Sequence, residues 1–178
     1  MSKRKSSGKH RSGARQKALQ ALYQWGMSQE SITSIEQQFL EEQDMAGIDV
    51  DYFGELLKQI PKQLEEIDSL FTGFLDRPLE QLDPVEKAIL RISSYELSQR
   101  IDVPYKAVIN EGVQLAKDFG ADDSHKYVNG ILDKVVEKIP LRVKEIGKRT
   151  RKPAAKTKKV VVKKKRAKIS VKDKTEQT

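Results

Sequence analysis

The sequence predicts an all-α protein, a compact bundle of six or seven helices over residues 13–140 that carries basic tails. Two observations support this fold class. Apolar residues recur at helical spacing through that whole region, and proline, glycine and capping residues divide it into segments of helix length. No alternating strand pattern occurs apart from the short, lysine-flanked segment 160–162. The chain therefore has the pattern of a single helical domain.

The first half contains three apolar segments. The first is predicted to be a helix that Gly26 ends, and its apolar positions are Ala14, Ala18, Ala21, Leu22 and Trp25. A weaker helix is expected to begin near Ser31 or Ser34 and to run to about residue 44. The third segment spans residues 50–75 and contains Pro61, which cannot sit inside a helix without losing a hydrogen bond. A kink, or two helices that meet at Pro61, is expected there.

The second half has sharper boundaries. Residues 83–86, Asp-Pro-Val-Glu, offer an N-cap, a proline at the first helical position and the glutamate of a capping box, Glu86. This helix should run to about residue 98 and lie centrally, because it is apolar on more than one side. The next helix is expected over residues 102–120. The last is expected to begin at its cap, Ser124, and to stop at Pro140.

Charge is distributed unevenly along the chain. The net charge is +8, but residues 1–15 carry six Lys/Arg and no acid, and residues 142–178 carry sixteen Lys/Arg against three acids. The body between them has 12 basic and 23 acidic residues, a net charge of −11. Such asymmetry is typical of arms that bind a polyanion. We therefore divide the chain into a basic arm (1–12), a helical domain (13–140) and a Lys-rich tail (141–178) that is expected to be disordered.

Several classes of function are disfavoured by the composition. The chain has no cysteine and two histidines, which argues against a thiolate or His-rich metal centre. It has no glycine-rich phosphate-binding motif, and no run reaches the roughly 18 apolar residues of a membrane helix. The best catalytic candidate is the cluster Asp122, Asp123 and His125, which a helix N-terminus explains better. We expect a cytoplasmic, non-enzymatic protein without cofactor, metal or membrane association.

Nucleic-acid binding fits the sequence better. The basic arm and the start of the first helix contribute Lys3, Arg4, Lys5, Lys9, His10, Arg11 and Arg15. Lysine and arginine there can neutralise phosphates, and arginine can also stack on unpaired bases. Tyr127 lies beside Lys126 near the start of the last helix, a pairing that single-strand binders use, although packing alone also explains this tyrosine. Tyr23 and Trp25 are interpreted first as core residues.

Four longer phrases resemble the NusB family of transcription antitermination factors. They are ARQKALQALYQW (14–25), LDPVEKAILRISSYEL (82–97), VPYKAVINEGVQLAKDFG (103–120) and DDSHKYVNGILDKV (122–135), and the resemblance covers residues 12–139. It implies a helical bundle of two packed halves. It also implies binding to a single-stranded boxA element of nascent ribosomal RNA, together with the ribosomal protein NusE. The complex would suppress premature termination by RNA polymerase, so this would be an adaptor and not a catalyst.

The resemblance also implies roles for individual residues. The family's basic arm falls on Lys9, Arg11 and Arg15, and its RNA-proximal turn and aromatic fall on Asp123, Lys126 and Tyr127. Its partner-facing positions fall on Tyr23, Glu80 and Glu86. Two departures stand out: the family commonly has phenylalanine where this chain has Tyr127, and nothing carries over to the tail from Lys144 onward. The surface that NusE would cover could also support self-association, and the sequence leaves the free oligomeric state open.

Two alternatives remain. The first is the NusB-like RNA-binding module of a ribosomal RNA methyltransferase, which would need a cofactor-binding α/β domain, and no such pattern follows residue 140. The second is a basic-tailed, DNA-compacting protein. The Lys-rich C-terminus supports it, but it explains neither the acidic body nor the four phrases.

Overall fold

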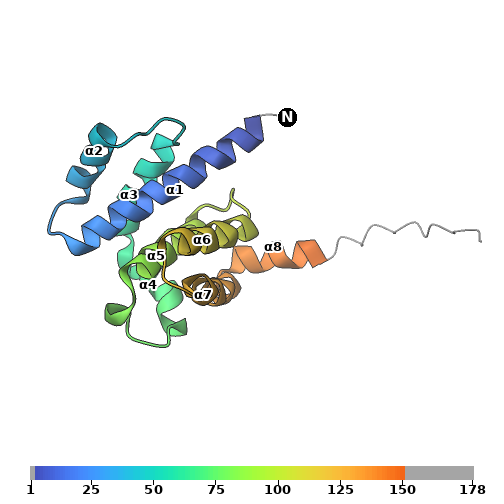
Figure 1. The fold of residues 1–178 in the computed structure, drawn as a ribbon. Coiled ribbons are helices and arrows are strands. Elements are labelled where there is room, and N and C mark those ends of the chain that lie inside the picture. Colours follow the sequence, from blue (N-terminus) through green and yellow to red (C-terminus); the bar gives the residue numbers. More distant parts are fainter. Residues whose placement is uncertain (1–2, 151–178) are drawn as a thin grey trace, which may run out of the picture.

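The computed structural model describes residues 3–150, and the side chains of residues 8–147. This part of the chain folds into helices without strands, as predicted (Figure 1). The α-helices are α1 (Lys3–Met27), α2 (Ile32–Glu42), α3 (Val50–Lys62), α4 (Leu64–Phe71), α5 (Pro84–Gln99), α6 (Tyr105–Phe119), α7 (Ser124–Lys138) and α8 (Pro140–Thr150). Two short 3₁₀ helices, η1 (Thr72–Phe74) and η2 (Leu79–Gln81), lie between α4 and α5.

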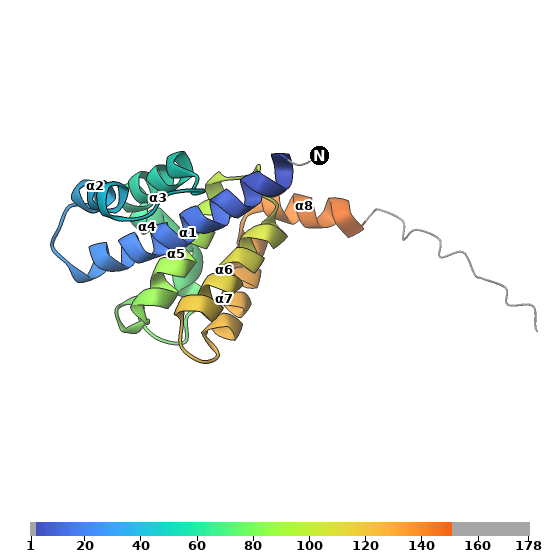
Figure 2. The same ribbon diagram turned by 45° about the horizontal axis from the view of Figure 1, so that its top comes forward.

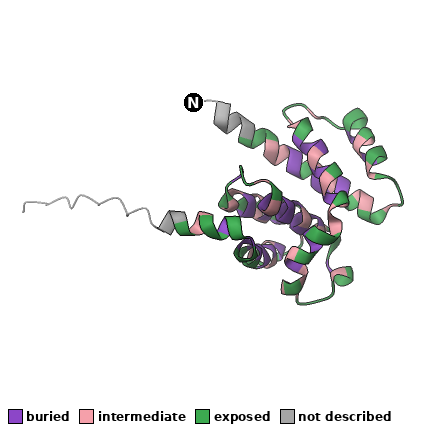
Figure 3. Cartoon of the chain, turned by 180° about the vertical axis from the view of Figure 1, so that it is seen from behind, coloured by how far each residue is buried: buried purple, intermediate pink, exposed green. Residues whose placement is uncertain are grey.

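The helices form two packed halves. α1, α2 and α3 contact one another, and α4 to α7 form the second group, with α5 at its centre. α1 lies between the two groups and also packs on α5 (Figure 2). Its predicted small residues Ala14, Ala18 and Ala21 are fully buried there, because only small side chains let neighbouring helices approach closely. Buried residues are concentrated on the inward faces of the helices (Figure 3).

The apolar segment 50–75 is two helices, one of the two outcomes expected from Pro61. α3 ends at Lys62, one residue after the proline, and α4 begins at Leu64. The side chain of Asp49 caps α3 by accepting a hydrogen bond from the amide of Tyr52 at 3.0 Å. Apolar residues on both sides of the break are buried in the same core, which explains why the apolar spacing persists across the proline.

α5, α6 and α7 pack together in the second half. Gly112 of α6 lies so close to both neighbours that an added Cβ would stand 2.7 Å from Ser93 Oγ and 3.0 Å from Leu132 Cδ1. Glycine therefore allows α6 to fit between α5 and α7. α5 begins as predicted: Asp83 accepts hydrogen bonds from the amides of Val85 and Glu86, and Pro84 occupies the first turn.

Two predicted capping roles need correction. The Glu86 carboxylate accepts a hydrogen bond from Ser124 Oγ at 2.7 Å, so it joins the starts of α5 and α7. Ser124 was expected to cap α7, but it is the first residue of the helix, and the N-cap position belongs to Asp123. The buried Ser124 hydroxyl donates its hydrogen bond to Glu86 of α5 and does not cap its own helix.

The structure also changes both ends of the helical domain. The segment 3–12, predicted as a basic arm, is the first part of α1. Pro140 ends α7 as expected, but it begins a further helix, α8. Arg142 of α8 is fully buried and donates to four backbone oxygens, those of Glu96, Leu97, Arg100 and Val103. The domain boundary at residue 140 is therefore corrected to include α8, while the predicted tail beyond residue 150 lies outside the described residues.

Candidate RNA-binding surface

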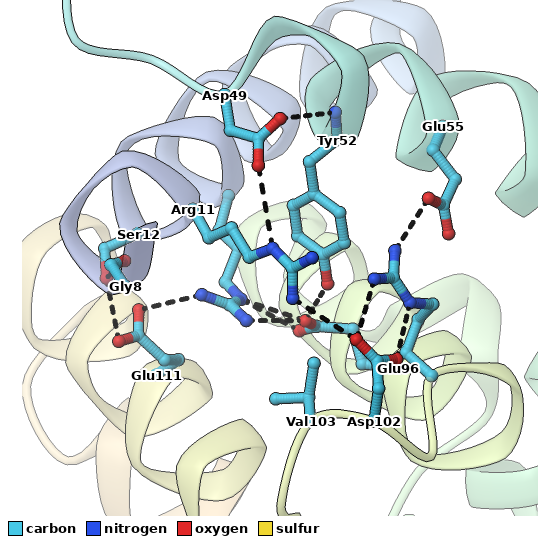
Figure 4. Close-up of polar contacts among 12 residues, drawn as sticks. Gly8, Arg11, Ser12, Asp49, Tyr52, Glu55, Glu96, Asp102, Val103 and Glu111 are labelled. Carbon is cyan, nitrogen blue, oxygen red and sulfur yellow. Dashed lines mark hydrogen bonds and ion pairs between the residues drawn. The ribbon is translucent and has the colours of Figure 1, made fainter. Parts of the chain in front are cut away.

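The first group of predicted RNA-binding residues lies in the N-terminal part of α1. Lys9 and His10 are exposed, and the His10 carbonyl accepts a hydrogen bond from the Asp49 amide at 3.1 Å. Arg11 is partly covered: its guanidinium lies 3.6 Å from Asp49, 3.4 Å from Asp102 and over the Tyr52 ring at 4.9 Å (Figure 4). The Arg11 side chain is 29% exposed, and two carboxylates share its charge.

Arg15 does not lie on this surface, and its predicted role is corrected. The residue is 4% exposed. Its Nε lies 3.0 Å from both carboxylate oxygens of Glu96, and its Nη2 lies 2.7 Å from Oε1. Burial opposes the charge, but the hydrogen bonds and charge of Glu96 outweigh it and hold the pKa of Arg15 above its usual value. This guanidinium is engaged in the core and has no free edge for a phosphate.

A polar network surrounds this pair, and the sequence did not reveal it. The Tyr52 hydroxyl donates to Glu96, and burial, followed by the charge of Glu96, raises the pKa of Tyr52 above its usual value. Arg100 bridges Glu55 at 2.7 Å and Asp102 at 2.8 Å. The hydrogen bonds from Arg100 lower the pKa of Asp102 to about 2. The network thus joins α1, α3, α5 and the α5–α6 loop.

Two recesses on the described part of the chain have volumes of about 480 and 600 Å³. The larger one, of about 600 Å³, is lined by Gly8, Arg11, Arg15, Asp102, Val103, Pro104, Ala107 and Glu111. Its two arginines face two acids, so it has no strong preference for either sign of charge. Nowhere in residues 8–147 do three or more His, Asp or Glu side chains gather to hold a metal ion.

The second predicted group lies at the start of α7. Asp123 has a left-handed backbone, with φ 66°, and its side chain makes no capping hydrogen bond. Its carboxylate instead lies 2.7 Å from Lys126 Nζ, and both side chains are more than 70% exposed, at 74% and 71%. The cap that we expected from Asp123 is therefore corrected to an exposed ion pair.

Tyr127 lies in the same turn and is half-buried. Its hydroxyl donates to Asp76 at 2.8 Å, and the guanidinium of Arg77 lies over its ring at 5.8 Å. Hydrogen bonds from Arg77 and then from Tyr127 lower the pKa of Asp76 to about 2. An aromatic ring with a cation over it, Arg77, and a second cation, Lys126, next to it in the sequence is a surface on which an unpaired base can stack.

The predicted partner-facing residues divide between two places. Tyr23, which we first interpreted as core, is 41% exposed and lines a hollow of about 280 Å³ together with the exposed Glu80. This hollow lies between the end of α1 and the start of α5, and Lys87 and Arg91 also border it. Glu86 is not part of its lining, and its carboxylate contacts Ser124 at the start of α7.

The structure does not bring the two predicted RNA-binding groups together. Gly8 and Arg11 line a hollow with Pro104 and Ala107 at the start of α6, whereas Asp123 follows the end of α6. A helix of 15 residues is about 22 Å long, so the two groups lie at opposite ends of that length. The α7 start instead adjoins the predicted partner face through Glu86 and Ser124.

None of the helices described here is long and apolar enough to cross a bilayer. Known proteins resemble this chain over most of its length. The family model described as "NusB family" matches residues 12–137. A Shewanella halifaxensis protein named "Transcription antitermination protein NusB" is 56% identical over 123 residues, which cover 69% of this chain and 91% of the relative. A Marinomonas protein of the same name is 52% identical over 139 residues, covering 77% and 80%.

Solved structures agree. The crystal structure of T. maritima NusB has a TM-score of 0.62 at 28% identity and covers 72% of this chain and 91% of its own. A chain from a structure described as a plectonemic RNA supercoil has a TM-score of 0.66 at 27% identity, covering 71% and 94%. The curated relatives are named as antitermination proteins and not as enzymes, in agreement with the predicted non-enzymatic class. This chain belongs to the NusB family.

Proposed function

We propose that this protein is a transcription antitermination factor. It binds a boxA-type single-stranded RNA of nascent ribosomal transcripts together with the ribosomal protein NusE, and it suppresses premature termination by RNA polymerase. This activity places it in the cytoplasm with the transcription machinery. The observation that carries the proposal is the start of α7, where the Tyr127 ring lies among Arg77, Lys126 and Asp123 and directly adjoins the partner face.

The geometry suggests how the RNA is held at this site. A base stacks on the open part of the Tyr127 ring, whose position is fixed by the hydrogen bond to Asp76 at 2.8 Å. Lys126 is 71% exposed, and its ion pair with Asp123 lies in solvent, where such pairs contribute little free energy, so it can turn to a phosphate. Lys9 and Arg11, at the other end of α6, contact a more distant part of the strand and contribute charge without reading bases.

The partner's role follows from charge. The body between residues 16 and 141 has a net charge of −11, which repels RNA. A basic partner that covers Tyr23 and Glu80 reduces this repulsion and adds its own cations beside the α7 start. The heterodimer is therefore expected to bind RNA more tightly than this protein alone. The hollow beside Tyr23, with a volume of about 280 Å³, offers a recess for a partner side chain.

Binding measured with boxA RNA, scrambled RNA and duplex DNA, with and without NusE, tests the proposal. We expect a preference for boxA that increases with NusE, and a loss of binding of roughly 5- to 150-fold on Tyr127→Leu, which keeps an apolar side chain but removes the stacking face. Lys62→Ala, on an exposed part of α3, is the matched control. Equal affinity for boxA and scrambled RNA, or tighter binding to duplex DNA, would contradict the proposal and favour the DNA-compacting alternative.

A further inference from the structure

A second aromatic ring, that of Phe74 in η1, lies against two lysines near the end of α7. Tyr127, Lys134 and Lys138 are separated by seven and four residues, so they share one face of the helix. This face is turned toward η1, where Phe74 is half-buried. Lys138 Nζ lies 4.6 Å and Lys134 Nζ 5.9 Å from the centre of the Phe74 ring. We call Phe74, Lys134 and Lys138 the α7 strip.

Among the described residues, no acid pairs with the lysines of the α7 strip. Both are exposed, and within residues 8–147 neither has a carboxylate oxygen within the 4.0 Å of an ion pair. Lys58 and Lys126, by contrast, pair with Glu36 and Asp123. The nearest acids on α7, Asp133 and Glu137, lie roughly 60–100° around the helix from the nearer lysine of the strip, and neither forms an ion pair with it. The strip is thus a local concentration of positive charge on an acidic body.

We propose that the α7 strip is a second contact for single-stranded RNA, which continues the Lys126–Tyr127 site along the helix. The inference rests on the function proposed above and extends its binding site. An RNA strand with one base on the Tyr127 ring can place a later base on the Phe74 ring. Lys134 and Lys138 neutralise the phosphates on either side of that base. Rings tolerate any base and lysines act as point charges, so this contact adds affinity without sequence preference.

The position of the strip supports this path. Tyr127 and Lys138 are separated by about 16 Å along the helix axis, so RNA bound at the α7 start must be extended to reach the end of the strip. α7 ends at Lys138, and the chain then enters α8, which the buried Arg142 holds against the domain. The strip therefore runs from the α7 start to the end of this helix.

The experiment compares two RNAs: a boxA core, and the same core with unpaired extensions of mixed sequence at both ends. We expect the wild-type full chain to bind the extended RNA more tightly. Lys134→Ala/Lys138→Ala should remove this gain and should lower the slope of log affinity against log salt by about 1.4 for the extended RNA only. Phe74→Leu should weaken binding of the extended RNA by roughly 5- to 150-fold.

Lys58→Ala/Lys62→Ala is the control for removing two exposed lysines four residues apart, here on α3, where Lys58 pairs with Glu36. Melting curves identify any variant that fails to fold. If Phe74→Leu fails to fold, the comparison of Lys134→Ala/Lys138→Ala with Lys58→Ala/Lys62→Ala still tests the proposal. Unchanged affinity and salt slope of Lys134→Ala/Lys138→Ala for the extended RNA would overturn the strip while leaving the proposed function intact. Weaker NusE binding with unchanged RNA binding would assign the strip to a protein partner. Failure of the wild type to bind either RNA would overturn both proposals.

Discussion

Arg15 and Glu96 form a buried two-point ion pair, in which Nε lies 3.0 Å from both carboxylate oxygens and Nη2 lies 2.7 Å from Oε1. The pair joins α1 to α5 and therefore one half of the protein to the other. Both side chains are almost fully buried, at 4% and 1% exposure. Charges removed from water are tolerated only when they are paired. Loss of either residue therefore leaves the charge of the other buried and unpaired.

Arg15→Ala is expected to lower the free energy of unfolding by about 3–5 kcal/mol, because it leaves the Glu96 carboxylate buried without its partner. Denaturant unfolding followed by circular dichroism measures this loss. Arg11→Ala is the comparison: Arg11 is 29% exposed and its carboxylate contacts are longer, so its loss should cost less than about 1 kcal/mol. An Arg15→Ala protein with wild-type stability and a weaker salt dependence of RNA binding would restore the role that the sequence predicted for Arg15.

Asp123 gives a prediction that separates backbone shape from charge. Its φ of 66° disfavours most residues other than glycine, asparagine and aspartate, and its side chain makes no capping hydrogen bond that a substitution could remove. Asp123→Asn should therefore melt like the wild type, whereas Asp123→Ala should lose about 1–2 kcal/mol through backbone strain. Asp123→Asn should also bind RNA more tightly, because Lys126 loses a carboxylate at 2.7 Å. Unchanged RNA affinity of Asp123→Asn in fluorescence anisotropy would remove this turn from the RNA site.

Tyr127→Phe tests the link between the aromatic ring and Asp76. The ring remains available for stacking, so RNA affinity should change little. The pKa of Asp76, which is about 2, should rise toward its ordinary value, since one of its two hydrogen-bond donors is lost while Arg77 remains. A lowered carboxyl pKa stabilises the fold above the ordinary pKa of 3.8, and this stabilisation is lost as the pH falls toward 2. The variant should therefore show a smaller loss of stability over that pH range. NMR titration of the Asp76 carboxyl measures the shift, and an unchanged midpoint would contradict the contact.

Much of the fold could be predicted from the sequence because its signals are local. The spacing of Ala14, Ala18 and Ala21 predicted a buried face of α1, and Pro61 marked the break between α3 and α4. Asp83 and Pro84 defined the start of α5. Each of these signals depends on residues within a few positions of one another, where helix geometry decides which side chains share a face.

The errors involve contacts across the chain or ambiguous residues. Arg15 was interpreted as RNA-binding because it follows the basic arm. Its partner Glu96 is 81 positions away, so no local signal in the sequence indicated the buried pair. Pro140 was interpreted only as a stop, although a proline at the first turn can equally begin a helix. Asp123 resembled a cap by residue type, but its left-handed backbone directs the side chain to Lys126. Among the predicted partner-facing residues, Tyr23 and Glu80 line one hollow, and their role in partner binding stays a prediction.

α8 is expected to contribute to the stability of the folded domain. The buried Arg142 donates to four backbone oxygens and also contacts Glu145 at 2.9 Å. Arg142→Met keeps an apolar stem but leaves buried carbonyl oxygens without donors, each costing about 1–3 kcal/mol. A chain that ends at Ile139 should lose comparable stability, whereas one that ends at Ile146 should melt like the full chain. Equal melting of the two truncated chains would contradict the assignment of α8 to the domain.

The chain that ends at Ile146 also tests the function of the Lys-rich tail. The sequence that it removes has no aromatic residue and more lysine than arginine, so it lacks groups that stack on bases. We expect the truncated protein to bind boxA and scrambled RNA more weakly at low salt, because counterion release from the tail is lost, and to keep the ratio of the two affinities. Anisotropy titrations at several salt concentrations measure both quantities for the full and truncated chains. A ratio that collapses on truncation would show that the tail contributes sequence preference, and equal affinities at low salt would show that it does not contact RNA.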